Sequence, residues 1–211
     1  MSAITWGFVA ASLVIIVVPG PSVLFTLARG VAWGRRIAVA SALGNSIGTL
    51  VLASLVAVGL GPVVTRWPGA STALQLAGGS YLVFLGVDAL RHRREVARTM
   101  AEPVGGRPSV SRAMRQGFTV GGLNPKALVF FLAVFPRFLR TRGAPTTLQL
   151  LTMGVVFSAL AFLSDSSWGV VAGTARAWLA GRPRRLVALR VTGGTVMVAL
   201  GASVVGGALL G

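Results

Sequence analysis

Two ionisable side chains stand within apolar stretches of this 211-residue chain. Lys126 is the only charged residue from 116 to 136, and Asp165 is the only one from 143 to 175. If these stretches cross a membrane, each charge costs roughly 2.5 to 3.5 kcal/mol at a helix centre. Residues retained at that cost usually bind a substrate or an ion, which makes both side chains candidates for a transport site.

Lys126 and Asp165 allow two interpretations. They can form a buried ion pair that only neutralises itself. Alternatively, Lys126 binds a substrate carboxylate while Asp165 binds a substrate ammonium group or a coupling proton. The two arrangements can also be successive stages of one cycle, in which the ion pair opens when the substrate arrives. The sequence leaves this choice open.

Two proline motifs interrupt apolar stretches at matching places. Pro19-Gly20-Pro21 breaks the first stretch, and Asn124-Pro125-Lys126 breaks the fourth. Because proline has no N–H, a carbonyl one turn earlier loses its helical partner. Gly20 lets another backbone or a ligand approach closely, and the amide of Asn124 can bond the freed groups. Interrupted helices at membrane depth often mark a binding site, although either break can also be a packing kink.

The rest of the chain has the composition of an integral membrane protein. Hydrophobic residues make up 54% of it and charged residues only 11%, and the mean hydropathy is +0.79, which is unusual for a soluble domain. About 20 apolar residues in a helix cross the ~30 Å hydrocarbon core. We therefore predict an all-α integral membrane protein with six transmembrane helices, near residues 4–27, 37–62, 69–89, 116–136, 147–172 and 187–209.

The net charge of +16 is concentrated in alternate loops between these spans. Fifteen of the nineteen arginines fall in the first, third and fifth loops, against Arg66, Arg137, Arg140 and Arg142 on the other side. The positive-inside rule then places the arginine-rich loops in the cytoplasm and both termini outside. Anionic lipid headgroups account for this charge. A nucleic-acid partner is not expected, because no aromatic residues are interleaved with the arginines.

An internal repeat relates the two halves of the chain. The pattern G-G-[ST]-x-x-V-x-L-G occurs at 78–86 and again at 193–201, the break at 20–24 aligns with 124–128, and Gly44 aligns with Gly154. These offsets of 115, 104 and 110 residues suit a duplicated three-span unit. Convergent use of glycine and proline in apolar sequence is the alternative.

A unit with an odd number of spans enters the membrane from opposite sides in its two copies. We therefore predict one transporter domain over 1–211, built as two inverted three-helix repeats. Repeat one covers about 1–90, a basic cytoplasmic loop covers about 91–115, and repeat two covers about 116–211.

Small and polar residues follow one face of the second and fifth spans. In the second span, Ser41, Asn45 and Thr49 stand directly beside the small residues Ala40, Gly44 and Gly48. In the fifth, Asp165 falls at helical spacing with small residues from Gly154 to Gly169. Such faces serve close helix packing, and they can equally line a substrate pathway. Asn45 is the amide on this face that we include among the site residues.

These motifs together resemble the LysE/RhtB-type amino-acid exporters, the lysine exporter and homoserine/threonine resistance translocators. The resemblance rests on Pro19-Gly20-Pro21, the Gly78-to-Leu82 run with Gly86, and Gly122-Leu123-Asn124-Pro125-Lys126, and it covers nearly the whole chain. It implies a carrier in the bacterial cytoplasmic membrane that exports amino acids or similar zwitterions, driven by ion exchange. Ser22 departs from the family, in which Asn or Asp often follows the Pro-Gly-Pro.

The predicted function is therefore secondary export of a small zwitterionic metabolite by alternating access. The alternatives are efflux of another small solute or cation, an assembly factor, or an intramembrane enzyme that pairs a serine with Lys126. Metal binding and cofactors are not expected, because no carboxylate, His or Cys cluster is present. Whether copies of the chain associate is left open. The predicted site consists of Gly20, Pro21, Ser22, Asn45, Asn124, Pro125, Lys126 and Asp165.

Overall fold

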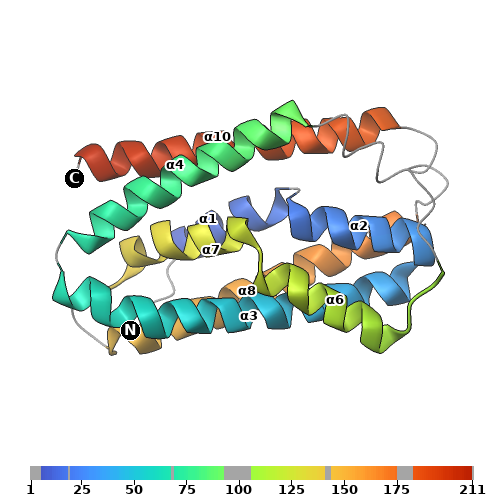
Figure 1. Cartoon of the computed structure of the whole chain (residues 1–211), viewed down its shortest axis with the longest axis horizontal. Helices are drawn as coiled ribbons and strands as arrows, with labels where there is room; N and C mark the ends of the chain where they lie inside the picture. Colours follow the sequence, from blue (N-terminus) through green and yellow to red (C-terminus); the bar gives the residue numbers. More distant parts are fainter. Residues whose placement is uncertain are drawn as a thin grey trace.

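A computed structural model of the chain describes residues 6–18, 20–67, 69–92, 106–140, 144–174 and 183–210. Within these ranges the regular structure is entirely helical, and the helices form an elongated bundle (Figure 1). The helices are α1 Trp6–Val17, α2 Pro21–Trp33, α3 Arg35–Arg66, α4 Ala70–Arg91, α6 Val110–Gly122, α7 Pro125–Ala133, the 3-10 turn η1 Phe135–Phe138, α8 Thr146–Thr174 and α10 Pro183–Leu210.

Three helices are long and apolar enough to cross a membrane. They contain the stretches Arg35–Gly59, Thr72–Arg91 and Thr146–Thr174. Two bent pairs, α1 with α2 and α6 with the segment Pro125–Phe138, pass the same criterion when each is counted as one span. The all-helical membrane architecture is therefore confirmed with three to five candidate spans. The sixth expected span corresponds to α10, whose apolar part, Gly194–Leu209, is shorter.

Both predicted breaks occur where the proline motifs stand. α1 ends at Val17 and α2 begins at Pro21, with a bend of 51° between them, while α6 and the segment Pro125–Phe138 meet at 42° across Leu123 and Asn124. Pro21 and Pro125 each take the first position of the following helix, where a missing N–H costs nothing. Pro19 itself lies outside the described residues.

A single glycine joins α2 to α3. Gly34 has φ +82°, in the left-handed region that favours glycine, and its N–H donates to the carbonyl of Gly30. This conformation ends α2 and lets α3 begin at the next residue, Arg35. The first arginine-rich loop is therefore only a tight turn.

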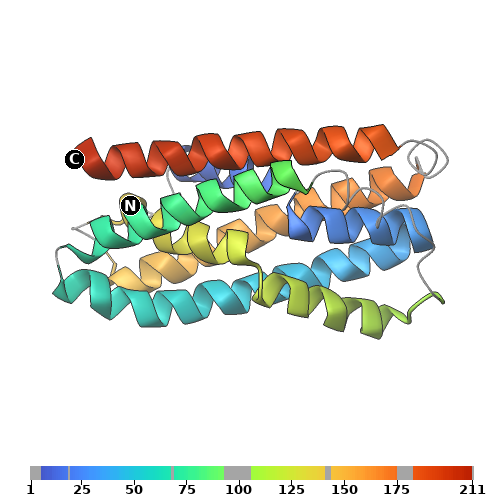
Figure 2. The ribbon, with the colours of Figure 1, turned by 45° about the horizontal axis from the view of Figure 1, so that its top comes forward.

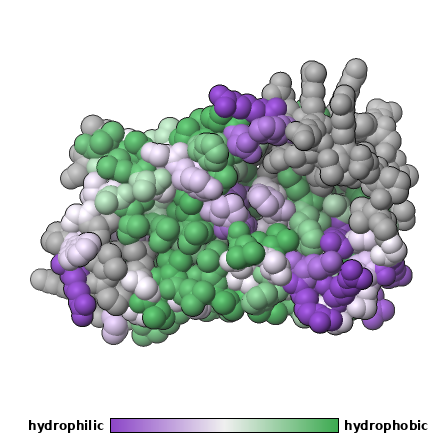
Figure 3. Space-filling view, viewed as in Figure 1, coloured by the Kyte–Doolittle hydropathy of each residue, from purple (hydrophilic) through white to green (hydrophobic). Residues whose placement is uncertain are grey.

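The bundle has two polar ends and an apolar middle. α10 ends at one end, beside the α3–α4 connection, while the α2–α3 turn and the start of α6 lie at the other (Figures 1 and 2). Hydrophobic colouring covers most of the middle of the visible face, with smaller hydrophilic groups above its centre, and hydrophilic colouring gathers over the second of these ends (Figure 3). Arginines exposed there are Arg35, Arg36, Arg107, Arg112 and Arg115. The predicted loop arginines at 93, 94, 98, 176 and 182 lie outside the described residues.

The small-residue faces pack helices closely around the bundle interior. A Cβ built on Gly44 or Gly48 would collide with the backbone of α6, at Met114 and Phe118 respectively. On α8, a Cβ on Gly154 would lie 2.8 Å from the Cβ of Ala53 on α3. Only glycine permits these approaches. The polar neighbours Asn45 and Thr49 are buried beside the packed glycines, so one region of α3 serves both packing and the interior site described below.

The two copies of the glycine-rich repeat pack against each other. A Cβ on Gly79 would lie 3.0 Å from the carbonyl oxygen of Gly201, and one on Gly201 would lie 2.6 Å from that of Gly79. The same reciprocity joins Gly86 and Gly194, at 2.6 and 2.8 Å. The second glycine of each copy thus meets the last glycine of the other, which requires that α4 and α10 run antiparallel (Figure 2). We call this contact the glycine seam.

Replacing Gly86 with alanine is expected to destabilise the glycine seam. The new Cβ would meet backbone and the side chain of Val198, which cannot move aside cheaply, so we expect a loss of about 1–3 kcal/mol. Gly206→Ala on α10 is the matched control, because no atom lies within 4 Å of its Cβ position. Thermal unfolding of both variants in detergent makes the comparison, and equal midpoints would contradict this account of the seam.

Candidate functional site

The side chain of Lys126 reaches from the second break to the first. Its Nζ donates hydrogen bonds to the carbonyl oxygens of Ile15 and Val18, both at 2.8 Å. In a continuous helix the carbonyl of Ile15 would accept from residue 19, which is a proline without an N–H. Val18 follows the last residue of α1, so its carbonyl is also without a helical partner. Lys126 therefore satisfies backbone groups that the first break sets free.

Asn124 links the two breaks a second time. Its side-chain oxygen accepts from the backbone N–H of Lys126 at 3.0 Å, which makes it the N-cap of α7. Its Nδ2 donates to the hydroxyl of Ser22 on α2 at 2.7 Å. Both side chains are buried. The amide was predicted to bond groups near its own break, and it also holds the start of α2.

Gly20 gives Lys126 the room that it occupies. A Cβ at this position would lie 2.8 Å from Nζ and 3.1 Å from both Cδ and Cε of that lysine. The backbone of Gly20 is extended, with φ −113°, so the conformation itself does not demand glycine. A side chain at position 20 would occupy the space that the Lys126 amino group fills, and this is why glycine is required there.

Asp165 has a different partner. Its Oδ2 accepts from Nδ2 of Asn45 on α3 at 2.7 Å, and the exposed fractions of the two residues are both 2%. The next residue of α3, Ser46, donates from its hydroxyl to the carbonyl of Ser158 on α8 at 2.7 Å. These two bonds fix α3 against α8 and orient the carboxylate.

Lys126 and Asp165 do not form an ion pair in this structure. Both residues are described, and no nitrogen–oxygen distance between them falls within 4 Å. They nevertheless line one cavity, together with Ser22, Asn45 and Asn124. The structure thus holds an amine and a carboxylate in one buried site. Each has its own hydrogen-bond partner, and the two do not neutralise each other as an ion pair.

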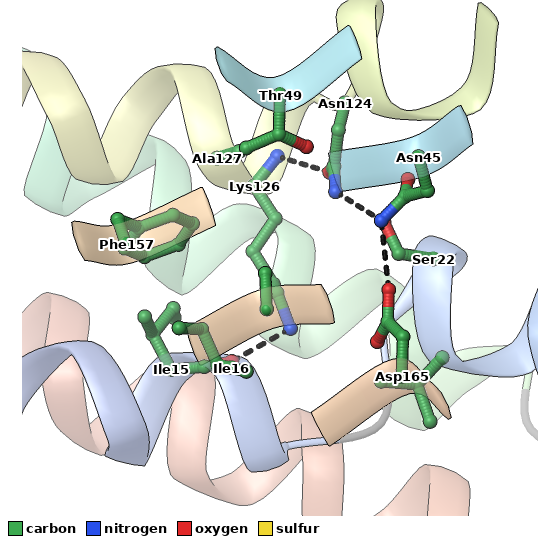
Figure 4. A pocket seen from close by; sticks show the side chains of 12 residues that line it. Ile15, Ile16, Ser22, Asn45, Thr49, Asn124, Lys126, Ala127, Phe157 and Asp165 are labelled. Carbon is green, nitrogen blue, oxygen red and sulfur yellow. Dashed lines mark hydrogen bonds between the residues drawn. The ribbon is translucent and has the colours of Figure 1, made fainter. Parts of the chain in front are cut away.

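The cavity has a polar side and an apolar side. Figure 4 shows Ser22, Asn45, Asn124 and Asp165 on one side, Phe157, Ile15 and Ile16 on the other, and the Lys126 side chain between them. The remaining lining residues are Val23, Thr49, Ala127 and Ala161. The volume is about 30 Å³, which holds about two water molecules. Any amino acid is several times larger, so binding one requires side chains or helices to move.

The structure assembles most of the predicted site residues. Ser22, Asn45, Asn124, Lys126 and Asp165 line the cavity. Gly20, Pro21 and Pro125 stand directly beside it and shape the breaks, without lining the space themselves. No cluster of three metal-ligating side chains occurs among the described residues.

Several features of the site were missed by sequence reasoning. Thr49 was placed on the polar face of the second span with Asn45 but was not included among the site residues, although it lines the cavity one turn from Asn45. Phe157 lies two turns from Asp165 on α8, but an apolar residue in an apolar helix gives no signal. The carbonyls of Ile15 and Val18 carry no signal in side-chain identity, although the proline four residues after Ile15 does predict a free carbonyl.

Fold and site together define a class of protein. The chain is a multi-pass helical membrane protein whose buried polar cavity lies between two interrupted helices. Such cavities at broken helices are typical of membrane transporters.

Comparison with known proteins identifies the family. The model of the LysE type translocator family matches residues 13–207, so the chain belongs to this family. The resemblance seen in the motifs is thereby confirmed. Because members of the family are transporters, the chain is a transporter and not an intramembrane enzyme.

Several relatives are similar over most of their length. The homoserine/homoserine lactone efflux protein of Salmonella typhimurium is 29% identical over 198 residues, 93% of each chain. The leucine efflux protein of an Enterobacter strain is 26% identical over 158 residues, 75% of this chain and 74% of that one. An uncharacterized membrane protein of Pseudomonas aeruginosa is 31% identical over 207 residues, 93% of this chain and 92% of the relative. No solved structure matches the chain.

Gly20→Ala tests the contact between the first break and Lys126. We expect the methyl group to push Nζ away from the carbonyls of Ile15 and Val18 and to lower transport by roughly tenfold, equivalent to about 1.4 kcal/mol. Gly59→Ala on α3 is the control, because the space around that glycine is open. The effect is measured as amino-acid transport by the two purified variants in liposomes. Wild-type rates in Gly20→Ala would show that the position of the amino group does not matter.

Proposed function

We propose that this protein exports amino acids or closely related small zwitterions across the bacterial cytoplasmic membrane. The observation that carries the proposal is the unpaired arrangement of Lys126 and Asp165 around one buried cavity. A zwitterion offers a carboxylate and an ammonium group a few ångströms apart, and the site offers one partner for each. The names of two relatives, which are efflux proteins for homoserine and for leucine, support the same solute class.

The charge balance of the site favours a zwitterion over a simple ion. An anion alone would leave Asp165 uncompensated in a buried site, and a cation alone would do the same for Lys126. A substrate with both charges lets Lys126 exchange the carbonyls of Ile15 and Val18 for a carboxylate. Asp165 then binds the ammonium group while keeping its bond from Asn45. This removes both bonds of Lys126 to the first break and leaves the bond of Asn124 to Ser22, so substrate binding loosens the junction between the two breaks.

In this proposal the chain consists of two inverted three-helix repeats, and their relative movement gives alternating access to the site. Repeat one comprises α1 to α4 and repeat two comprises α6 to α10, with α1–α2 and α6–α7 as the corresponding broken spans. The reciprocal glycine seam supports the inverted relation, because position two of each motif meets position nine of the other, as a two-fold relation between the copies requires. The site lies where the two breaks meet, which is where rocking of one repeat against the other would open it to either side.

The direction of transport is outward, and exchange with an ion drives it. Asp165 is the residue that can carry a coupling proton when no ammonium group is bound. The arginine-rich end of the bundle faces the cytoplasm and its anionic lipids, and both termini face outward.

Neutralising either charge is expected to abolish efflux. Asp165→Asn keeps an oxygen that accepts from Asn45, so this variant should remain as stable as wild type while transport falls at least about tenfold. Lys126→Ala should lose transport and some stability, since it leaves two buried carbonyls without a donor. Leu128→Ala, at a partly exposed position on the same helix as Lys126, is the control. Normal amino-acid efflux in proteoliposomes by either charge variant would remove that residue from the site.

The exchange Lys126→Asp with Asp165→Lys distinguishes binding from self-neutralisation. If the two residues only balance each other, the double variant should recover activity. We expect none, because an aspartate at 126 would face the carbonyls of Ile15 and Val18 and repel them. The assay is efflux from cells that produce equal amounts of each protein in the membrane. Recovery to wild-type rates would contradict the proposed substrate role.

Two engineered cysteines test the orientation. The chain has no cysteine, and Gly69 and Gly106 lie at opposite ends of the bundle with open space around each. In intact cells, a membrane-impermeant maleimide should label Gly69→Cys but not Gly106→Cys, and both should react after the membrane is opened. The opposite pattern would reverse the proposed topology, and equal labelling of both in intact cells would contradict a transmembrane arrangement of α4.

A further inference from the structure

The apolar side of the cavity has a defined position relative to Asp165. Phe157, Ala161 and Asp165 all line the cavity from α8, at intervals of four residues along one helix face. Each interval rises about 6 Å, so the phenylalanine lies roughly 12 Å along the axis from the aspartate. A substrate whose ammonium group binds Asp165 therefore finds Ala161 one turn away and Phe157 one turn further.

Phe157 forms a rigid end to this space. Its ring lies 5.2 Å from that of Phe130 and 4.9 Å from that of Phe131, both centroid to centroid, and its exposed fraction is 4%. Both neighbours also contact Phe135, so the ring belongs to a buried aromatic cluster. Movement of Phe157 would require the whole cluster to repack. Ala161 is the small residue that leaves room in front of the ring.

The charge on this side of the cavity is positive. The amino group of Lys126 bonds the carbonyl of Ile15, a residue of the apolar side. Asp165 is the one acidic residue among those that line the cavity, and it is already assigned to the ammonium group. A cationic substrate side chain would approach Lys126 without a second carboxylate to compensate it. Repulsion between Lys126 and a cationic substrate side chain selects against that substrate, just as a favourable contact selects for another.

We propose that the site selects α-amino acids with uncharged side chains, and that Ala161 and Phe157 limit the size of those side chains. This inference rests on the proposed export function. The amino and carboxyl groups of the substrate bind Asp165 and Lys126, and its side chain lies in a subsite formed by Ile15, Ile16, Ala161 and Phe157. Dibasic amino acids are excluded by charge, and bulky ones by the aromatic wall.

Exchange in proteoliposomes tests the charge selection. Vesicles that contain purified wild-type protein are loaded with unlabelled leucine, and uptake of labelled leucine, alanine and lysine is measured from outside. We expect exchange of leucine and alanine, with lysine exchanged at least about tenfold more slowly. Lysine exchange as fast as that of leucine would overturn the inference while leaving amino-acid export intact. Failure of all three amino acids to exchange would instead contradict the proposed function itself.

Ala161→Val tests the size limit. The added methyl groups narrow the space before Phe157, so we expect leucine exchange to fall roughly tenfold relative to alanine exchange. Ala159→Val on the exposed face of α8 has the same change in volume and is expected to keep the wild-type ratio. Phe157→Leu, which keeps an apolar filler in the aromatic cluster, should shift the ratio in the opposite direction. An unchanged leucine-to-alanine ratio in both site variants would overturn the assignment of the subsite.

Discussion

Inside a bilayer, a backbone carbonyl that loses its helical partner must find another donor within the protein. This constraint organises the centre of the molecule. The prolines of the first break free the carbonyl of Ile15, and the chain satisfies it with the amine of Lys126, more than 100 residues away. Asn124 then caps α7 while holding Ser22 at the start of α2. The first interruption is thus completed by Lys126 of the second, and the second is tied to the first through the bond of Asn124 to Ser22. Neither break can be relaxed alone, and this makes their junction a point at which a bound solute can act on both halves.

The second consequence is that opposite charges remain separated in a small buried volume. Lys126 is held by carbonyl dipoles and Asp165 by an amide, so each charge is partly compensated by a neutral group. Such bonds are weaker than a direct ion pair, and in the proposed mechanism a substrate that supplies full charges displaces them. A direct Lys–Asp pair would compete more strongly with the substrate. The polar contacts of α3 with α8 and of α7 with α1 therefore stabilise the site, and they leave the amine and the carboxylate without a charged partner.

Much of this arrangement was predictable, because the strongest physical penalties leave marks in the sequence. A charge or a proline in an apolar stretch is costly, so Lys126, Asp165 and the two breaks were recognisable at once. The face of small and polar residues around Asn45 was recognisable by its spacing. The sequence could not tell which of these residues pack and which line the cavity. In the structure the glycines pack against α6 and the polar residues Asn45 and Thr49 line the cavity. The partners of Lys126 could not be predicted, because they are backbone atoms brought near by tertiary packing. Phe157 was missed for a related reason, since an aromatic residue in a membrane helix is the same in sequence whether it faces lipid, core or cavity.

The glycine seam has an implication for the history of the chain. Its contacts are reciprocal: position two of each motif meets position nine of the other. A contact of this kind is isologous, the form that two identical subunits related by a two-fold axis share. A half-length ancestor carrying one copy of the motif would have needed no new surface to bind a second copy of itself. For the two subunits to run antiparallel, that ancestor would have had to insert in both orientations. In the proposed topology, the excess of arginine in alternate loops is the feature that would commit each half to a single orientation.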